Sequence, residues 1–205
     1  MNRVHGYVLA GGGSTRFGQD KALVEFEGVP MLLRMQQLLT AALGNATIIA
    51  APRKYASIEV DSIADRWPGE GPLGGIITAL LFTAEARRPA EWNLIVGCDM
   101  PLLTPGWLGY MAERALASGA EVIVPRSGSG LEPLCTCWRT SAAPALQGAY
   151  DRGIRKITDA MQHLKTEILD EPDWKRFDSA GRLFWNMNTL ADYEQIKRVM
   201  KAGQS

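Results

Sequence analysis

The start of the chain constrains its fold more than any other stretch. A short apolar segment, residues 8–10, runs into a glycine-rich loop that ends at Lys21. Glycine permits positive φ and has no Cβ, so backbone N–H groups of such a loop can turn inward around an anion. Arg16 adds a planar fork for phosphate oxygens, and Lys21 adds a compact positive charge. The loop, with Gly11, Gly12, Gly13 and Gly18, therefore predicts a nucleotide-phosphate cradle at the end of a strand.

Two common phosphate-binding patterns do not match this loop. Gln19 follows Gly18 where a P-loop requires Lys and then Ser or Thr, and Arg16 stands where a dinucleotide fingerprint has its last glycine. An ATPase P-loop and a Rossmann cofactor site are both disfavoured. The alternative left open is a tight strand-to-helix turn in which the glycines serve a steric purpose alone.

Length and composition favour one domain over residues 1–205. The chain has 22 Lys and Arg against 22 Asp and Glu, so no net field attracts nucleic acid. Cys98, Cys135 and Cys137 match no zinc-ribbon pattern, and the last two are expected as buried thiols on one face of a strand. No apolar run is long enough to span a bilayer. We expect a cytoplasmic protein without a nucleic-acid or membrane partner.

Apolar patterns alternate along the chain as parallel βαβ units require. Strands are expected at residues 47–51, 92–98, 121–125 and 167–169, with a weaker one at 57–60, and helices at 31–39, 73–86, 104–117, 141–150, 155–164 and 190–201. This alternation predicts an α/β fold with a mainly parallel sheet flanked by helices.

A second Gly- and Pro-rich segment, residues 65–75, precedes the helix expected at 73–86. Pro72 suits a first helical position, whereas Gly74 and Gly75 in the first turn cost about 1 kcal/mol each relative to Ala. Such a cost indicates a close approach to the backbone. Either a ligand or the sheet beneath the helix could make that approach.

Asp99 follows the apolar run 92–98 and precedes Pro101, which lacks an N–H and stiffens the turn. Ligands of parallel sheets bind beyond the carboxyl ends of the strands, so Asp99 and the glycine-rich loop are expected at one edge. A carboxylate opposite a phosphate loop suits Mg²⁺ that bridges nucleotide phosphates. Capping of the next turn is the alternative for Asp99 alone, and its pairing with the loop favours the metal.

Five motifs follow one another between about residues 4 and 200: LAGGGSTRFGQDKALVEFEG, GPLGG, VGCDMPLLTP, EPL and NMNTLADY. Together they closely resemble the molybdenum cofactor guanylyltransferase (MobA-like) family of nucleotidyltransferases. The resemblance implies a three-layer Rossmann-like nucleotidyltransferase fold, in which residues 1–100 bind the nucleotide and 101–205 the acceptor. It implies an enzyme that uses Mg²⁺ to transfer GMP from GTP to the terminal phosphate of molybdopterin or molybdenum cofactor, releasing pyrophosphate.

The resemblance also implies roles for individual residues. Lys21 and Arg16 would act on the triphosphate, Asp65 would contact the base or ribose, and Asp99 would hold Mg²⁺. The expected catalytic residues are Arg16, Lys21 and Asp99. The expected nucleotide-binding residues are Leu9, Ala10, Gly11, Gly12, Gly13, Lys21, Asp65, Gly71, Pro72, Leu73 and Asp99.

On the acceptor side, the resemblance implies that Asn186 and Asn188 line the pocket near the acceptor phosphate. Arg155 is added because it lies in a basic cluster with Arg152 and Lys156. A solvated helix face is the alternative for this cluster. Molybdoenzymes or cofactor-insertion proteins are the protein partners that the resemblance suggests.

The chain departs from the family pattern at two places. Residues 50–52 read Ala-Ala-Pro where members often carry Asn, so one nucleotide contact would be lost or supplied elsewhere. Leu190 and Ala191 replace a proline and an acidic residue of the usual ending. Three alternatives stay open: a related enzyme with another phosphorylated acceptor, one that uses CTP, and a nucleotide-binding protein without turnover.

Overall fold

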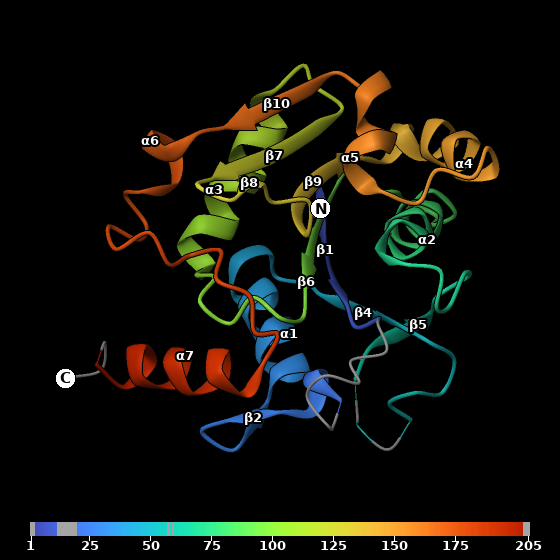
Figure 1. Cartoon of the computed structure of the whole chain (residues 1–205). Helices are drawn as coiled ribbons and strands as arrows, with labels where there is room; N and C mark the ends of the chain where they lie inside the picture. Colours follow the sequence, from blue (N-terminus) through green and yellow to red (C-terminus); the bar gives the residue numbers. More distant parts are fainter. Residues whose placement is uncertain (1–2, 12–19, 57, 59, 203–205) are drawn as a thin grey trace.

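A computed structural model describes residues 3–11, 20–56, 58 and 60–202 (Figure 1). The strands of its central sheet are β1 (Val4–Leu9), β4 (Thr47–Ala50), β5 (Ser62–Ala64), β6 (Trp92–Gly97), β7 (Val122–Ser127), β8 (Gly130–Leu131), β9 (Cys135–Arg139) and β10 (Thr166–Leu169). Their order is β10-β7-β9-β6-β1-β4-β5, with β8 paired to β7. The strands β6, β1, β4 and β5 run parallel, whereas β9 is antiparallel to both β6 and β7. The sheet is mixed and mostly parallel, which confirms the expected class.

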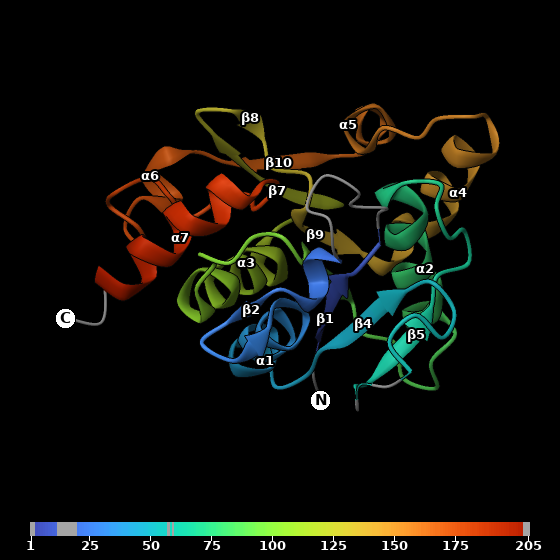
Figure 2. The same ribbon diagram turned by 60° about the horizontal axis from the view of Figure 1, so that its bottom comes forward.

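Helices cover both faces of the sheet (Figures 1 and 2). They are α1 (Met31–Leu43), α2 (Pro72–Ala84), α3 (Pro105–Ala117), α4 (Ala143–Asp151), α5 (Ile157–Ala160), α6 (Glu171–Trp174) and α7 (Leu190–Ala202). Successive side chains of a strand point to opposite faces, and β1 follows this rule. Val4 and Val8 pack in the core with α1 and α3, whereas Tyr7 and Leu9 pack with α2 and α4. These two cores make the three-layer arrangement.

The ends of the long helices follow from local chemistry. The Thr104 hydroxyl accepts a hydrogen bond from the Trp107 amide at 3.2 Å, and Pro105 takes the first position of α3. Gly44 ends α1 in the left-handed conformation, with φ of 76°. Pro72 begins α2 as expected. Three-residue 3-10 turns add η2 (Lys21–Leu23), η3 (Thr140–Ala142) and η4 (Met161–His163).

The glycines at the start of α2 pack against the protein itself. A Cβ on Gly74 would lie 3.0 Å from the Trp67 Cβ, and one on Gly75 would lie 3.1 Å from the Leu9 Cδ2. Gly75 therefore lets α2 approach β1 closely, which supports the packing interpretation of these residues.

One expected strand was wrong. The structure has no strand within the described part of residues 57–60, and the strand that pairs with β4 is β5, a few residues later. Ile58 and Val60 instead pack onto the core between α1 and the sheet. β5 itself is a short edge strand with exposed Ser62 and Ala64, so it lacks the apolar pattern that marks the other strands.

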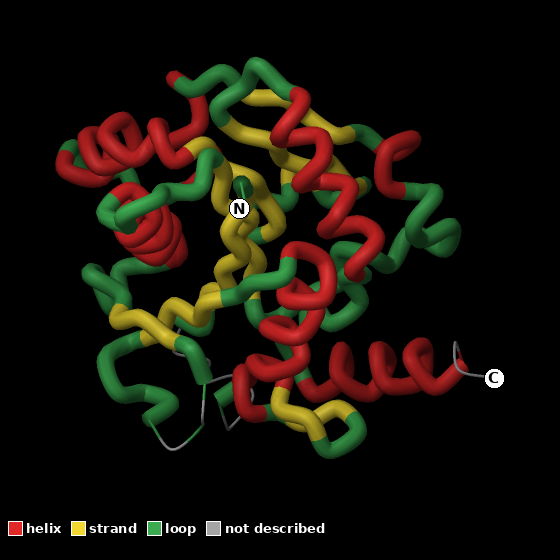
Figure 3. The backbone as a smooth tube through the Cα atoms, turned by 180° about the vertical axis from the view of Figure 1, so that it is seen from behind, coloured by secondary structure: helices red, strands yellow, loops and turns green. Residues whose placement is uncertain are grey.

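The C-terminal helix α7 lies beside a small hairpin made of β2 (Glu25–Phe26) and β3 (Val29–Pro30) (Figure 3). The Tyr193 hydroxyl donates to the Glu25 carbonyl oxygen at 3.1 Å. Cys135 and Cys137 are buried on β9, as expected. Across the described residues, no helix combines the length and apolar character needed to cross a membrane.

Candidate active site

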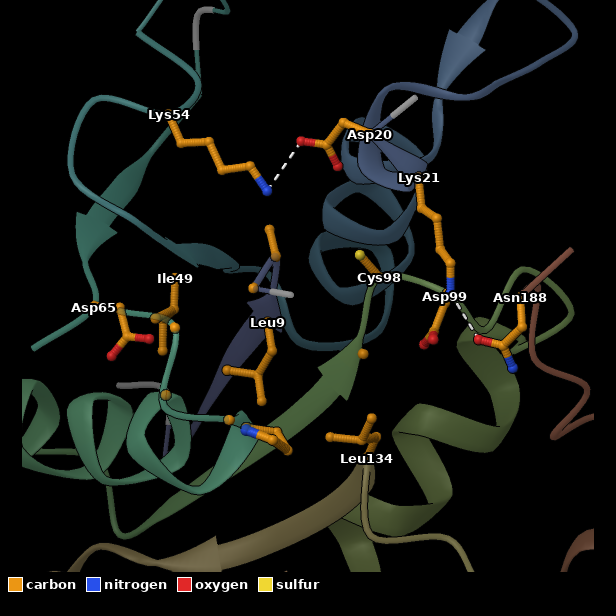
Figure 4. A pocket seen from close by; sticks show the side chains of 17 residues that line it. Leu9, Asp20, Lys21, Ile49, Lys54, Asp65, Cys98, Asp99, Leu134 and Asn188 are labelled. Carbon is orange, nitrogen blue, oxygen red and sulfur yellow. Dashed lines mark hydrogen bonds and ion pairs between the residues drawn. The ribbon is translucent and has the colours of Figure 1, made fainter. Parts of the chain in front are cut away.

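The register of the parallel strands brings four chain segments to one edge of the sheet. Leu9 of β1 is level with Ile49 of β4 and with Gly97 of β6. Ala50 of β4 is level with Ala64 of β5. The chain therefore leaves all four strands at the same edge, where ligands of parallel sheets bind. The segments that follow these strands line a cleft of about 550 Å³ (Figure 4).

Most of the expected nucleotide-binding residues line this cleft. They are Leu9, Ala10, Gly11, Lys21, Asp65, Gly71, Pro72 and Asp99, and Asn188 joins them from the expected acceptor set. Leu73 is fully buried and is not among the lining residues. Gly12, Gly13 and Arg16 lie outside the described residues, so their predicted roles are untouched by the structure.

Other residues of the cleft were not expected from the sequence: Asp20, Ile49, Lys54, Gly69, Gly97, Cys98 and Leu134. Gly75, for which the sequence left open an approach by a ligand or by the sheet, also lines the cleft. The strand-end rule that selected Asp99 would also have selected Lys54, because Lys54 follows β4 at the same edge. Leu134 belongs to the EPL motif, for which no role was inferred.

Asp99 is placed by the turn that follows β6. The Leu9 carbonyl accepts from the Cys98 amide at 3.2 Å, and the Asp99 carbonyl accepts from the Met187 amide at 2.8 Å. A Cβ on Gly97 would lie 2.8 Å from the Asp99 Oδ1, so only glycine leaves room for the carboxylate there. Burial raises the pKa of Asp99, and the positive charge of Lys21 opposes that shift.

One oxygen of Asp99 has unused bonding capacity. Its Oδ1 is buried without a hydrogen-bond partner in the part of the chain that the structure describes. A buried polar atom without a partner costs free energy, and a bound ion relieves that cost. A carboxylate oxygen is a ligand that Mg²⁺ prefers. No group of three or more His, Cys, Asp or Glu side chains gathers for a metal among the described residues. Asp99 thus suits an ion whose remaining ligands are phosphate oxygens and water.

The Lys21 side chain extends toward Asp99 (Figure 4), and its charge acts on the Asp99 carboxyl. Asp20 caps the turn η2 by accepting from the Ala22 amide at 3.1 Å, which fixes the backbone around Lys21. The Lys21 ammonium donates to the Asn188 Oδ1 at 2.7 Å. The cleft therefore holds a carboxylate and an ammonium, as a bound metal ion and phosphate oxygens would require.

Asp65 follows β5 and is held in a turn. Its amide donates to the Ala50 carbonyl at 2.7 Å. Its Oδ1 accepts from the Trp67 amide and from the Thr78 hydroxyl, both at 3.0 Å. These bonds fix the carboxylate at the end of the cleft near the start of α2, where it can accept hydrogen bonds from a base or ribose.

The two other residues expected at the acceptor lie apart from the lining set. Asn186 is exposed and is not among the residues that line the cleft. Arg155 stacks 3.7 Å over the Tyr150 ring and pairs with Glu70 at 3.1 Å. Tyr150 also donates to Glu70. Arg155 is therefore engaged with the loop that precedes α2.

Comparisons with known proteins find relatives that match nearly the whole chain. Residues 6–166 match the model of the MobA-like NTP transferase domain. The chain is 31% identical to a probable molybdenum cofactor guanylyltransferase of Pyrococcus furiosus, over 97% of this chain and 98% of that one. It is 30% identical to the protein of the same name from Pelotomaculum thermopropionicum, over 98% and 94%.

Solved structures share the fold. Molybdopterin-guanine dinucleotide biosynthesis protein A from Archaeoglobus fulgidus gives a TM-score of 0.83 at 24% identity, covering 97% of this chain and 99% of that one. A CMP:2-keto-3-deoxy-manno-octonic acid synthetase complexed with CTP gives 0.71 at 11% identity, covering 98% and 99%. By its sequence match over residues 6–166 and its relatives of near-equal length, the chain belongs to the MobA-like NTP transferase domain family and is a nucleotidyltransferase.

Proposed function

We propose that this chain transfers GMP from GTP to the terminal phosphate of molybdopterin, or of its molybdenum-bound form, and releases pyrophosphate. The observation that carries the proposal is the placement of the Asp99 carboxylate opposite the Lys21 ammonium in one cleft. The names of the relatives, molybdenum cofactor guanylyltransferase, support the choice of nucleotide and acceptor.

The proposed reaction needs no nucleophile from the protein. An oxygen of the acceptor's phosphate monoester attacks the α-phosphorus of GTP and forms a new P–O bond. The bond from the α-phosphorus to the oxygen that bridges the β-phosphorus breaks, and its electron pair leaves with pyrophosphate. The acceptor phosphate is anionic near neutral pH, so alignment and charge stabilisation account for catalysis.

The side chains of the cleft divide these tasks. Asp99 would hold Mg²⁺, which when bound neutralises phosphate charge and polarises the α-phosphate. Lys21, oriented by Asn188, would bind phosphate oxygens. Asp65 would accept hydrogen bonds from the base or ribose. Arg16 is the second cation that the sequence predicts at the triphosphate.

The acceptor would enter from the side of Asn188, a residue of the C-terminal segment whose side chain contacts Lys21. Asn186 and Arg155 stay predictions for this side. Arg155 would have to leave Glu70 and Tyr150 to reach an acceptor phosphate.

Incubation of the protein with Mg²⁺ and labelled GTP, with and without molybdopterin, tests the proposal. We expect pyrophosphate release that depends on molybdopterin, and GTP should outcompete CTP and ATP in a mixture. Release with CTP in place of GTP, or with a different phosphorylated acceptor, would assign the site to a related enzyme. No release with any acceptor would support a nucleotide-binding protein without turnover.

A further inference from the structure

A second lysine, Lys54, lines the cleft from the segment after β4, which lies outside the five sequence motifs. The Lys54 ammonium lies 3.0 Å from the Asp20 Oδ2, and both residues line the cleft. Both side chains keep some contact with solvent, at 29% exposure for Lys54 and 25% for Asp20. Figure 4 shows the Lys54 side chain extending from the segment after β4 toward Asp20.

The loop after β4 is shaped to place this lysine. Arg53 adopts a left-handed conformation, with φ of 61°, which is uncommon for a residue other than glycine. The Lys54 amide donates to the Ala51 carbonyl at 3.1 Å and closes the turn. Backbone strain of this kind persists where the surrounding structure over-determines it, and it clusters at functional sites.

Asp20 does not depend on Lys54 for its hydrogen bonds. The Tyr55 hydroxyl donates to the Asp20 Oδ2 at 3.0 Å, and the Ala22 amide donates to the Oδ1 at 3.1 Å. Tyr55 is buried, and burial followed by the charge of Asp20 raises its pKa, so the hydroxyl stays a donor. The carboxylate therefore keeps two donors when the lysine moves away.

Binding of a triphosphate in the cleft would be favoured by more than one cationic side chain. Its described lining residues include the carboxylates Asp20, Asp65 and Asp99 and the ammonium groups of Lys21 and Lys54. A triphosphate adds several negative charges to this cleft. The Lys21 ammonium donates a hydrogen bond to Asn188. The compact, flexible ammonium of Lys54 instead pairs with Asp20, a carboxylate that has other hydrogen-bond donors.

We propose that Lys54 is a second phosphate-binding lysine, which exchanges Asp20 for a phosphate oxygen of the nucleotide. This inference rests on the proposed function, because it takes the cleft to be a nucleoside triphosphate site. It also explains how the chain manages without Asn at residues 50–52: the same loop supplies a cation a few residues later.

Equilibrium binding of GTP, GMP and guanosine to the wild-type protein, K54M and K54R tests the inference. Removal of a charge-assisted contact to phosphate should lower the affinity by about tenfold. We expect K54M to lose about this much affinity for GTP, to lose less for GMP and to keep wild-type affinity for guanosine. K54R retains the positive charge and should recover most of the GTP affinity. K175M, which removes a lysine paired with Glu171 on α6, is the matched control and should bind all three as the wild type does.

The pairing with Asp20 gives a second test. D20N removes the competing charge and leaves an oxygen to accept from the Ala22 amide, so it should tighten GTP binding. The gain of D20N over the wild type should be larger than the gain of D20N/K54M over K54M, because the double variant has no lysine to release. Equal gains in both backgrounds would overturn the exchange.

Two further outcomes would overturn the role of Lys54. The first is wild-type affinity of K54M for GTP. The second is an equal loss for GTP and guanosine, which would place the lysine at the base or give it a structural role. Failure of the proposed function would be seen differently, because the wild-type protein itself would prefer another triphosphate. K54M would then be compared with the wild type for binding of that triphosphate.

Discussion

Lys21 and Asn188 stand 167 positions apart in the sequence, and their side chains meet at 2.7 Å over the cleft. Asn188 is held in place by the start of α7, because the Asp192 carboxylate accepts from the Asn188 and Thr189 amides, each at 2.8 Å. The C-terminal segment therefore completes a site whose other lining residues, apart from Leu134, come from the first half of the chain.

This contact predicts a graded loss of activity. K21A removes a phosphate contact and should lower turnover by about two orders of magnitude. N188A leaves the ammonium in place without its partner and should lower turnover less, by about tenfold. Q195A, an exposed position of α7, is the control and should leave turnover unchanged. Steady-state pyrophosphate release measures all three, and normal turnover in N188A would show that Asn188 does not orient Lys21.

The tight space at Gly97 gives a second prediction. In G97A the new methyl group would lie 2.8 Å from the Asp99 Oδ1, so the carboxylate must move. We expect turnover to fall by about tenfold or more, since a displacement of about 1 Å at a reacting group costs up to about a hundredfold. G109A is the matched control because a Cβ there meets no atom within 4 Å. Equal turnover in G97A and G109A would contradict the placement of Asp99.

Glu91 gives a prediction for stability against pH. Arg3 donates to Glu91, and Arg139 donates to it at 2.6 Å; these bonds lower the pKa of the Glu91 carboxyl below its ordinary value. A carboxyl with a lower pKa in the folded state stabilises that state above the unfolded pKa, and this stabilisation is lost as the pH falls through the folded pKa. The melting temperature of the wild type should exceed that of E91Q at neutral pH, and the difference should shrink in acid. A difference that is constant with pH would contradict the ion pairs.

The sequence predicted the parts of the fold that are marked by apolar pattern and by caps. The apolar run expected as a strand at residues 92–98 contains β6 (Trp92–Gly97), and Thr104 caps α3 through its hydroxyl, as expected. The direction of β9 could not be predicted, because a strand buried on both faces has the same pattern whether it runs parallel or antiparallel. β5 was not predicted because an exposed strand of three residues has too little apolar pattern.

The site followed a similar division. Asp99 and Lys21 lie within motifs that indicate their chemistry, and both line the cleft. Lys54 stands in a turn without a motif, so it was overlooked although the turn follows an expected strand; the register of β1 with β4 places this turn at the same edge. Arg155 looked like a free cation in the sequence, since its partners Glu70 and Tyr150 come from distant segments.

The most direct test of the α-phosphate transfer site is single-turnover release of pyrophosphate by wild type and D99N. GTP, Mg²⁺ and molybdopterin are held at saturating concentrations, and GTP binding is measured separately on the same preparations. D99N keeps the size of the side chain and removes its charge. We expect acceptor-dependent release by the wild type and release about a hundredfold slower by folded D99N. Near-normal release by D99N would contradict a role of the Asp99 carboxylate in the transfer.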